Sequence, residues 1–168
     1  MKVLVAIDGL SQAEEILRFT MQITLHAVKP PTILVVSEHK KELQASQAEK
    51  ILSLARELLD TQDLITRIRT GDPGKEIMQE TREGKYDLLI IGEIHANYLT
   101  QLLQGSRTAY IAEDAPCPVI IVKGITWPIR RILLCDSGAG RSSVLSRFTA
   151  QLAETLEGEE EVTILHVM

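Results

Sequence analysis

Residues 87–122, DLLIIGEIHANYLTQLLQGSRTAYIAEDAPCPVIIV, decide the fold of this chain. The stretch begins and ends with short, continuous apolar runs, which are typical of strands covered on both faces in a parallel sheet. Between the runs lies a loop that closes with Gly105 and Ser106. Ser106 is a good helix N-cap, and the free N–H groups of a first helical turn attract anions. The stretch therefore predicts a strand, a loop with an anion site, a helix and a second strand.

The rest of the chain alternates in the same way between short apolar and longer amphipathic segments. Within 40–60, for example, Leu43, Ile51 and Leu58 recur at helical spacing. This rhythm predicts an α/β fold with an open, mainly parallel five-stranded sheet sandwiched between helices. The expected strands are 2–7, 32–37, 64–69, 87–92 and 118–122, and the expected helices are 11–27, 40–60, 74–84 and 106–114.

Composition narrows the class of protein further. The chain has 168 residues, 45% of them hydrophobic, and a formal charge of −5 with scattered basic residues, which argues against a nucleic-acid partner. We find no apolar run of membrane-spanning length and no signal-peptide cleavage site, so we expect a cytoplasmic protein that does not bind membranes. Cys117 and Cys135 lie in or beside apolar runs without metal-ligand spacing, and we expect both to be small buried side chains.

The C-terminal part of the chain repeats its beginning. Two parallel strands and one helix cannot bury their apolar faces alone. We therefore expect this tail to pack on the first domain, to exchange with another chain or to belong to a longer tandem protein. Of these three, we favour the longer tandem protein. The alignment makes Asp8 and Asp136 the residues that end two equivalent strands. The matches are LVAID (4–8) with ILLCD (132–136), FTMQ (19–22) with FTAQ (148–151) and TILVV (32–36) with TILHV (163–167), at offsets from 128 to 131.

These sequences resemble the universal stress protein family in its tandem-domain form. The loop after the fourth strand follows the family pattern G-x2-G-x9-G-[ST] in its spacing, with Gly92, His95 and Gly105-Ser106 at the key positions. The opening VAIDG (5–9) and the ending APCPVIIV (115–122) are also similar to the family. The resemblance implies an adenine nucleotide alpha hydrolase-like α/β fold. It also implies a complete family domain at 1–123, a linker at 124–129 and the first β-α-β of a truncated second domain at 130–168.

The resemblance implies a function as well. It points to a regulatory stress-response protein that binds ATP, with Mg²⁺ as the companion ion. It also points to a homodimer that pairs near Val119–Val122, with exchange of the C-terminal β-α-β unit as a variant. The ligand-binding residues carried over from the family pattern are Ile7, Asp8, Gly9, Val36, Gly92, His95, Gly105, Ser106 and Arg107.

His95 stands where the family has its second glycine, and this leaves two hypotheses open. Glycine lets the backbone approach a phosphate without a Cβ in the way. Histidine can instead donate a hydrogen bond to the phosphate. The Glu93 carboxylate repels a phosphate unless a cation or Arg107 offsets its negative charge. The first hypothesis is a ligand-gated ATP-binding module, and the second is a nucleotide-free universal stress protein that acts through its dimer surface or a partner. Asp8 likewise either faces adenosine or caps the turn before Ser11.

No catalytic constellation emerges from the residue pattern. The four histidines are far apart in the sequence, and no serine or cysteine stands in a nucleophile signature. Backbone amides and a metal ion can stabilise phosphoryl transfer without a protein nucleophile. Slow ATP hydrolysis is therefore the most that we expect.

Overall fold

The computed structural model describes residues 1–24, 29–37, 41–61, 63–92, 107–124, 128–136, 142–156 and 160–166. All five strands and four helices expected in the first domain are present, with ends within three residues of the expected ones. The elements are β1 (Val3–Ile7), α1 (Ala13–Thr24), β2 (Thr32–Ser37), α2 (Lys41–Leu58), β3 (Ile65–Thr70), α3 (Pro73–Gly84), β4 (Leu88–Gly92), α5 (Arg107–Asp114), β5 (Val119–Val122), β6 (Arg131–Asp136), α6 (Ser142–Thr155) and β7 (Glu161–His166).

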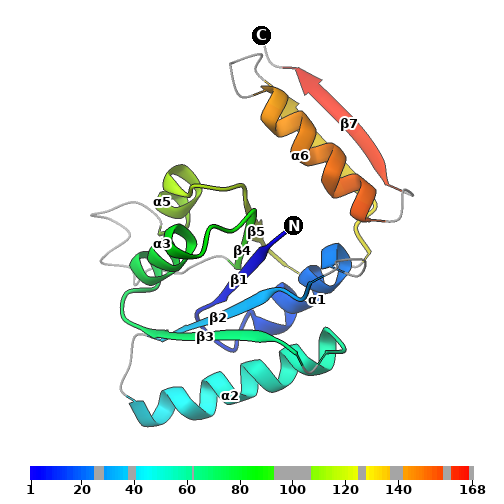
Figure 1. Ribbon diagram of the computed structural model, residues 1–168. Helices are drawn as coiled ribbons and strands as arrows, with labels where there is room; N and C mark the ends of the chain where they lie inside the picture. Colours follow the sequence, from blue (N-terminus) through cyan, green and yellow to red (C-terminus); the bar gives the residue numbers. More distant parts are fainter. Residues whose placement is uncertain are drawn as a thin grey trace.

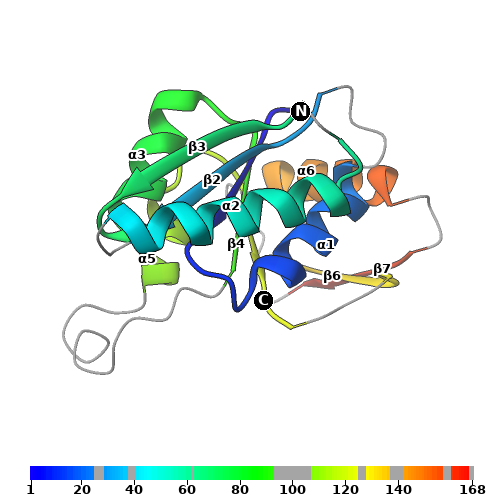
Figure 2. The same cartoon turned by 90° about the horizontal axis from the view of Figure 1, so that it is seen from below.

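The first five strands form one parallel sheet in the order β3-β2-β1-β4-β5 (Figure 1). Helices α1 and α2 cover one face, and α3 and α5 cover the other (Figures 1 and 2). The faces alternate along each strand: Val5 packs with α1 and α2, whereas its neighbours Leu4 and Ala6 pack with α3 and α5. Because both faces are covered, β1, β2 and β4 are almost wholly buried, and the expected open α/β sheet between helices is confirmed.

The turn between β3 and α3 shows how local sequence sets the ends of elements. Asp72 is the N-cap of α3, and its Oδ1 accepts a hydrogen bond from the Lys75 N–H at 3.1 Å. Pro73 follows in the first helical turn, where its missing N–H costs nothing. The helix ends at Lys85, whose φ of 50° places it in the left-handed region.

A partly buried ion-pair cluster ties the edge strand β3 to α3. The Arg69 guanidinium donates from Nε and Nη2 to Glu80 Oε2 at 2.9 and 2.8 Å. The Tyr86 hydroxyl donates to Glu80 Oε1 at 3.0 Å. The hydrogen bond to Glu80 raises the pKa of Arg69, and burial raises the pKa of Tyr86. The cluster therefore holds β3 in the sheet although much of the strand surface is exposed.

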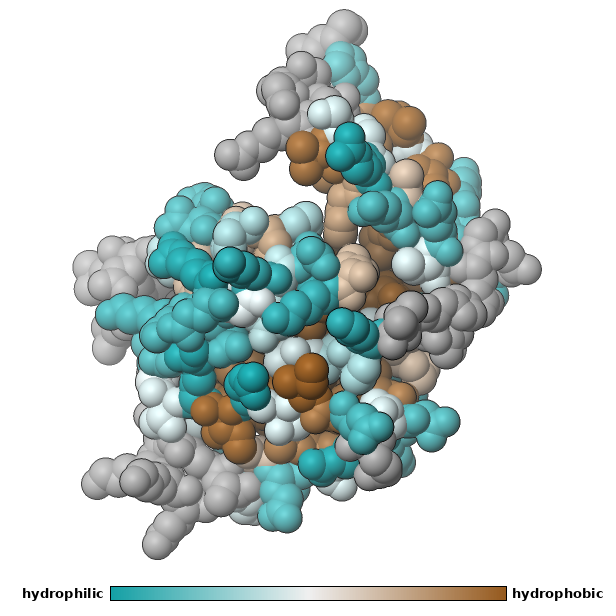
Figure 3. All heavy atoms as spheres, in the orientation of Figure 1, coloured by the Kyte–Doolittle hydropathy of each residue, from teal (hydrophilic) through white to brown (hydrophobic). Residues whose placement is uncertain are grey.

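The C-terminal repeat forms a separate unit of two parallel strands, β6 and β7, joined by α6. Helix α6 packs on α1, and Phe148, Leu152 and Leu156 join the hydrophobic cluster of the first domain. The Ile129 N–H also donates to Gln22 Oε1 of α1 at 3.0 Å. Packing on the first domain, one of the three expected outcomes, is therefore seen for the helix. The sheet itself stays largely uncovered, and Figure 3 shows hydrophobic side chains at the surface of this unit.

Strand register corrects the alignment of the repeat by one residue. Leu4 pairs with Thr32 in the first domain, whereas Leu133 pairs with Thr163 in the C-terminal unit. Because Thr163 is the counterpart of Thr32, Leu133 is the counterpart of Leu4, which gives an offset of 129 rather than 128 for this strand. As expected, Asp136 is the last residue of β6, and Asp8 directly follows the last residue of β1.

The cysteines also differ from expectation. Cys117 is half-buried, and burial raises the pKa of its thiol. Cys135, expected to be buried, is exposed. It lies on the side of β6 away from Leu134, which is buried. The expectation for Cys135 is wrong because it was drawn from the apolar run around this residue, whereas one side of β6 is exposed.

Candidate functional site

The strand order creates a switch point between β1 and β4. The chain leaves β1 for β2 and β3 on one side and later places β4 and β5 on the other side. In open α/β sheets, ligands bind outside the carboxyl ends of the strands where the direction reverses in this way. Ile7 ends β1, Asp8 and Gly9 follow it, and Gly92 ends β4. Four of the expected ligand-binding residues therefore lie at the switch point.

Val36 lies on the neighbouring strand at the same edge. Ile7 pairs with Val35, so Val36 is one residue farther toward the carboxyl end of the sheet. Its side chain is buried in the cluster beneath α3 and α5. Any contact of Val36 with a ligand would therefore come from its backbone.

The two glycines at the switch point have different surroundings. A Cβ added to Gly92 would collide with the end of the Gln12 side chain and would lie 2.9 Å from Cδ1 of Ile16. The ends of these two side chains thus pack directly against the backbone of β4, which gives a reason for glycine here that involves no ligand. A Cβ added to Gly9 would meet no atom of the described residues within 4 Å. Gly9 is therefore the position where the edge offers open space beside the backbone.

The remaining expected residues belong to the segment between β4 and α5. His95, Gly105 and Ser106, and also Glu93, lie outside the described residues. Arg107 is the first residue of α5, which packs through Ile111 on the same face of the sheet as Val36. The start of this helix thus belongs to the layer that covers Ala6 and Val36. The roles expected for the loop residues stay predictions.

One basic residue at this edge was missed by the sequence reasoning. Val122 pairs with Gly92, and Lys123 follows directly, so this lysine begins beside the end of β4. The only sequence signal is a lysine after an apolar run. Its neighbour Gly92 becomes apparent only when the strand order is known.

Two further observations limit what the described residues can do. They contain no group of three or more His, Cys, Asp or Glu side chains that could hold a metal ion. They also contain no helix long and apolar enough to cross a membrane.

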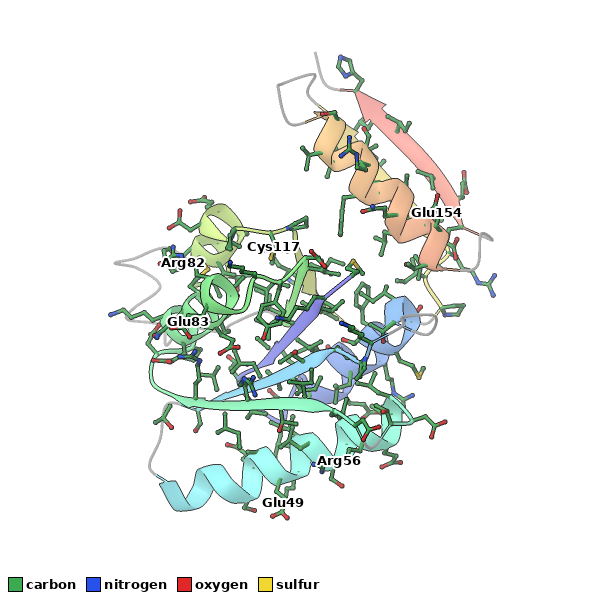
Figure 4. All side chains as sticks on the ribbon, viewed as in Figure 1. Glu49, Arg56, Arg82, Glu83, Cys117 and Glu154 are labelled. Atoms are coloured by element: carbon green, nitrogen blue, oxygen red, sulfur yellow. The ribbon has the colours of Figure 1, made fainter. Side chains whose placement is uncertain are left out.

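A shallow hollow of about 440 Å³ lies between α3 and α5 rather than at the switch point. Its lining includes Arg82 and Glu83, which are labelled on α3 in Figure 4. Glu83 already pairs with Arg69, and the hollow is open and contains no expected ligand-binding residue. We therefore place the candidate site at the edge between β1 and β4.

The fold and its edge define an open, doubly wound α/β protein. A family model described as the universal stress protein family matches residues 1–123, and the chain belongs to that family. Among curated relatives, universal stress protein Slr1230 of Synechocystis is 29% identical over 123 residues, covering 71% of this chain and 41% of the relative. Universal stress protein MJ0531 of Methanocaldococcus jannaschii is 29% identical over 89 residues, covering 53% and 51%. The chain thus spans about half the length of these relatives.

Solved structures show the same fold. A universal stress protein in complex with cAMP matches 73% of this chain and 97% of its own, with a TM-score of 0.58 and 21% identity. One from Archaeoglobus fulgidus in complex with dAMP matches 73% and 98%, with a TM-score of 0.54 and 21% identity. Another, from Archaeoglobus fulgidus DSM 4304, matches 98% of this chain and 65% of its own, with a TM-score of 0.69 and 16% identity. The last match includes the β6-α6-β7 unit.

Proposed function

We propose that this chain is a cytoplasmic regulatory protein of the stress response that binds ATP outside the carboxyl ends of β1 and β4. Membership of the universal stress protein family supports this proposal, as do the cAMP and dAMP held by two similar proteins. The observation that carries it is the open space beside Gly9 at the switch point. An adenine nucleotide would approach the backbone there.

The residues at this edge fit the nucleoside part of such a ligand. The Asp8 carboxylate would accept hydrogen bonds from the ribose hydroxyls or the adenine amino group. The backbone of Val36 would lie against adenine, and Ile7 and Gly9 would form the floor beneath it. These contacts need no movement of the buried strands.

The phosphates would lie near the start of α5. The positive end of a helix and its free N–H groups favour phosphate, and Ser106, Gly105 and His95 precede this helix. Arg107 supplies a cation there, and a Mg²⁺ ion bound with ATP would reduce the negative charge. Binding that changes how copies pair would give the ligand a regulatory effect.

One observation favours a second function. Gly92 is explained by its packing against Gln12 and Ile16, so its presence does not require a phosphate. In this alternative the protein is a nucleotide-free universal stress protein that acts through a homodimer or another partner. Copies would pair along the edge strand β5, where Ile121 is exposed, or by exchange of the C-terminal unit.

Calorimetric titration with ATP, with and without Mg²⁺, tests the proposal on chain shown to be free of nucleotide after purification. Gly9→Ala adds a methyl group in open space, so it should keep the fold and weaken ATP binding at least several-fold. Asp8→Asn should also weaken binding. Asp63→Asn, at the exposed amino-terminal side of β3, makes the same charge change away from the site and should leave binding unchanged.

Each outcome separates the two functions. Saturable binding that Gly9→Ala weakens supports the ATP site at this edge. Binding that ignores both Gly9→Ala and Asp8→Asn moves the site elsewhere. No binding to the folded chain refutes the nucleotide proposal and favours the nucleotide-free module. Phosphate release measured in the same samples should stay near background.

A further inference from the structure

The hollow between α3 and α5 combines apolar surface with exposed cations. Its lining includes Met78, which is buried, and Tyr110 of α5, whose side chain is 43% exposed. Lys75 and Arg82 of α3 also line it, and both are exposed. Neither cation has an ion-pair partner in the part of the chain that the structure describes. The hollow therefore presents two uncompensated positive charges beside an aromatic ring.

Helix α3 separates its acids from its bases. Glu80 and Glu83 form ion pairs with Arg69 of β3 at 2.8 and 2.5 Å. Lys75 and Arg82 are seven positions apart and therefore share another side of the helix. Figure 4 shows Arg82 on the side of α3 toward α5 and Glu83 on the side toward β3. The acids are thus used inside the domain, whereas the two bases are left at the hollow.

Glu83 also lines the hollow, but its charge is already compensated. Gln79 donates to its Oε1 at 2.7 Å, and Arg69 donates to its Oε2 at 2.5 Å. These two hydrogen bonds hold the pKa of Glu83 below its ordinary value. The unpaired cations therefore set a positive potential at the hollow, although the whole chain has a formal charge of −5.

We propose that this hollow binds an extended, acidic segment of a different protein. Small-molecule sites enclose most of their ligand, whereas this hollow is shallow and open, so it suits a peptide better. Cation clusters are a recurring means of recognising acidic motifs, and charge complementarity discriminates between partners. The proposal does not rest on ATP binding, because the hollow contains none of the residues at the edge between β1 and β4.

The spacing of the two cations defines the motif. Lys75 and Arg82 lie about 10.5 Å apart along the helix axis, at about 1.5 Å per residue. Alternate residues of an extended segment share one face and rise about 3.3 Å each. Two carboxylates four positions apart thus span about 13 Å, within reach of two long cationic side chains. An apolar residue midway between them would lie against Met78 and Tyr110.

Fluorescence anisotropy tests the proposal with a short fluorescein-labelled peptide as the probe. The peptide carries two glutamates four positions apart, a leucine midway between them, and serine or threonine elsewhere. The wild-type chain should bind this glutamate probe saturably at low ionic strength and more weakly as salt screens the charges. A probe with lysines in place of the glutamates should bind at least tenfold more weakly. A probe with serine in place of the leucine should bind several-fold more weakly.

Charge reversal shows whether the probe binds at the hollow. Lys75→Glu combined with Arg82→Glu should weaken binding of the glutamate probe at least tenfold and should create binding of the lysine probe. Tyr110→Ala should weaken binding several-fold without changing the preference for acid. Lys50→Glu combined with Arg56→Glu is the control, because it makes the same change in net charge on α2, over the other face of the sheet. It should leave binding unchanged, and circular dichroism checks that each variant is folded.

Several results would overturn the proposal. One is the absence of saturable binding to the folded wild-type chain, and another is equal binding of the glutamate probe to the reversed hollow. Displacement of the probe by inorganic phosphate at constant ionic strength would show a small-anion site instead. A reversal that alters only self-association would assign the hollow to a second copy. Asp8→Asn and Gly9→Ala should not change probe binding, so the failure of this proposal and that of the ATP site are distinguishable.

Discussion

The repeat provides a matched pair of positions for one substitution. Ile33 and Ile164 occupy equivalent places in β2 and β7, at the offset of 131 that relates Thr32 to Thr163. Ile33 is 0% exposed and packs in the cluster with Ile51 and Ala55 of α2. Ile164 is 69% exposed, since the described part of the second unit has no counterpart of α2. Identical side chains in equivalent strands therefore face opposite environments.

The expected costs follow from this difference. Ile33→Ala opens a cavity in a filled core and should lower the free energy of unfolding by about 3 kcal/mol, within the usual 2–5 kcal/mol. Full burial of an isoleucine contributes about 1.5–3 kcal/mol, and only about a third of Ile164 is buried. Ile164→Ala should therefore cost less than about 1 kcal/mol.

Urea unfolding followed by far-ultraviolet circular dichroism measures both costs. The lowest practical protein concentration is used, so that self-association does not contribute. Wild type, Ile33→Ala and Ile164→Ala are compared for both midpoint and slope. Equal losses in the two variants would refute the reasoning, because they would show that Ile164 is buried in solution. A small loss for Ile33→Ala would show that the first-domain core is looser than its packing implies.

Other predictions concern the cluster between β3 and α3. Arg69→Met should lower the free energy of unfolding by roughly 2–3 kcal/mol, because it leaves the buried Glu80 carboxylate without its main donors. Arg18→Met is the control, since it removes an exposed ion pair. It should lower the free energy of unfolding by less than about 0.5 kcal/mol in the same denaturation assay. Asp72→Ala removes the N-cap of α3 and should cost about 1 kcal/mol by the same measurement. Burial raises the pKa of Tyr86 above its ordinary value of 10.0, so the contribution of this residue to stability should be constant below pH 10 and fall as pH rises further. Tyr86→Phe should lose this component of the alkaline fall in a pH series of unfolding curves, and an unchanged fall would contradict it.

The strands and helices of the first domain could be predicted because their signals are local. Apolar runs of strand length and helical spacings of leucine and isoleucine do not depend on the partner of each segment. The turn at Gly71-Asp72-Pro73 has an equally local cause, since the Asp72 side chain caps the helix that follows it. The sequence resemblance likewise found the family, because it rests on several spaced residues together.

The geometry of the candidate site could not be predicted, because it depends on contacts between distant segments. The reversal between β1 and β4 is a property of strand order, and no residue encodes it by itself. Lys123 was missed for this reason. Gly92 was interpreted as a phosphate glycine, yet the side chains that pack against it, those of Ile16 and Gln12, come from 76 and 80 positions earlier in the chain.

The C-terminal unit shows why burial cannot be inferred from residue type alone. Leu133 and Leu165 match buried leucines of the first domain in kind, strand and register, yet both are exposed. What differs is the presence of α3 and α5, which the first domain supplies about forty or more residues after its second strand begins. Cys135 was expected to be buried by the same residue-based reasoning and is exposed for the same reason. An apolar strand thus predicts that a cover is needed, but its residues do not show which other segment supplies that cover.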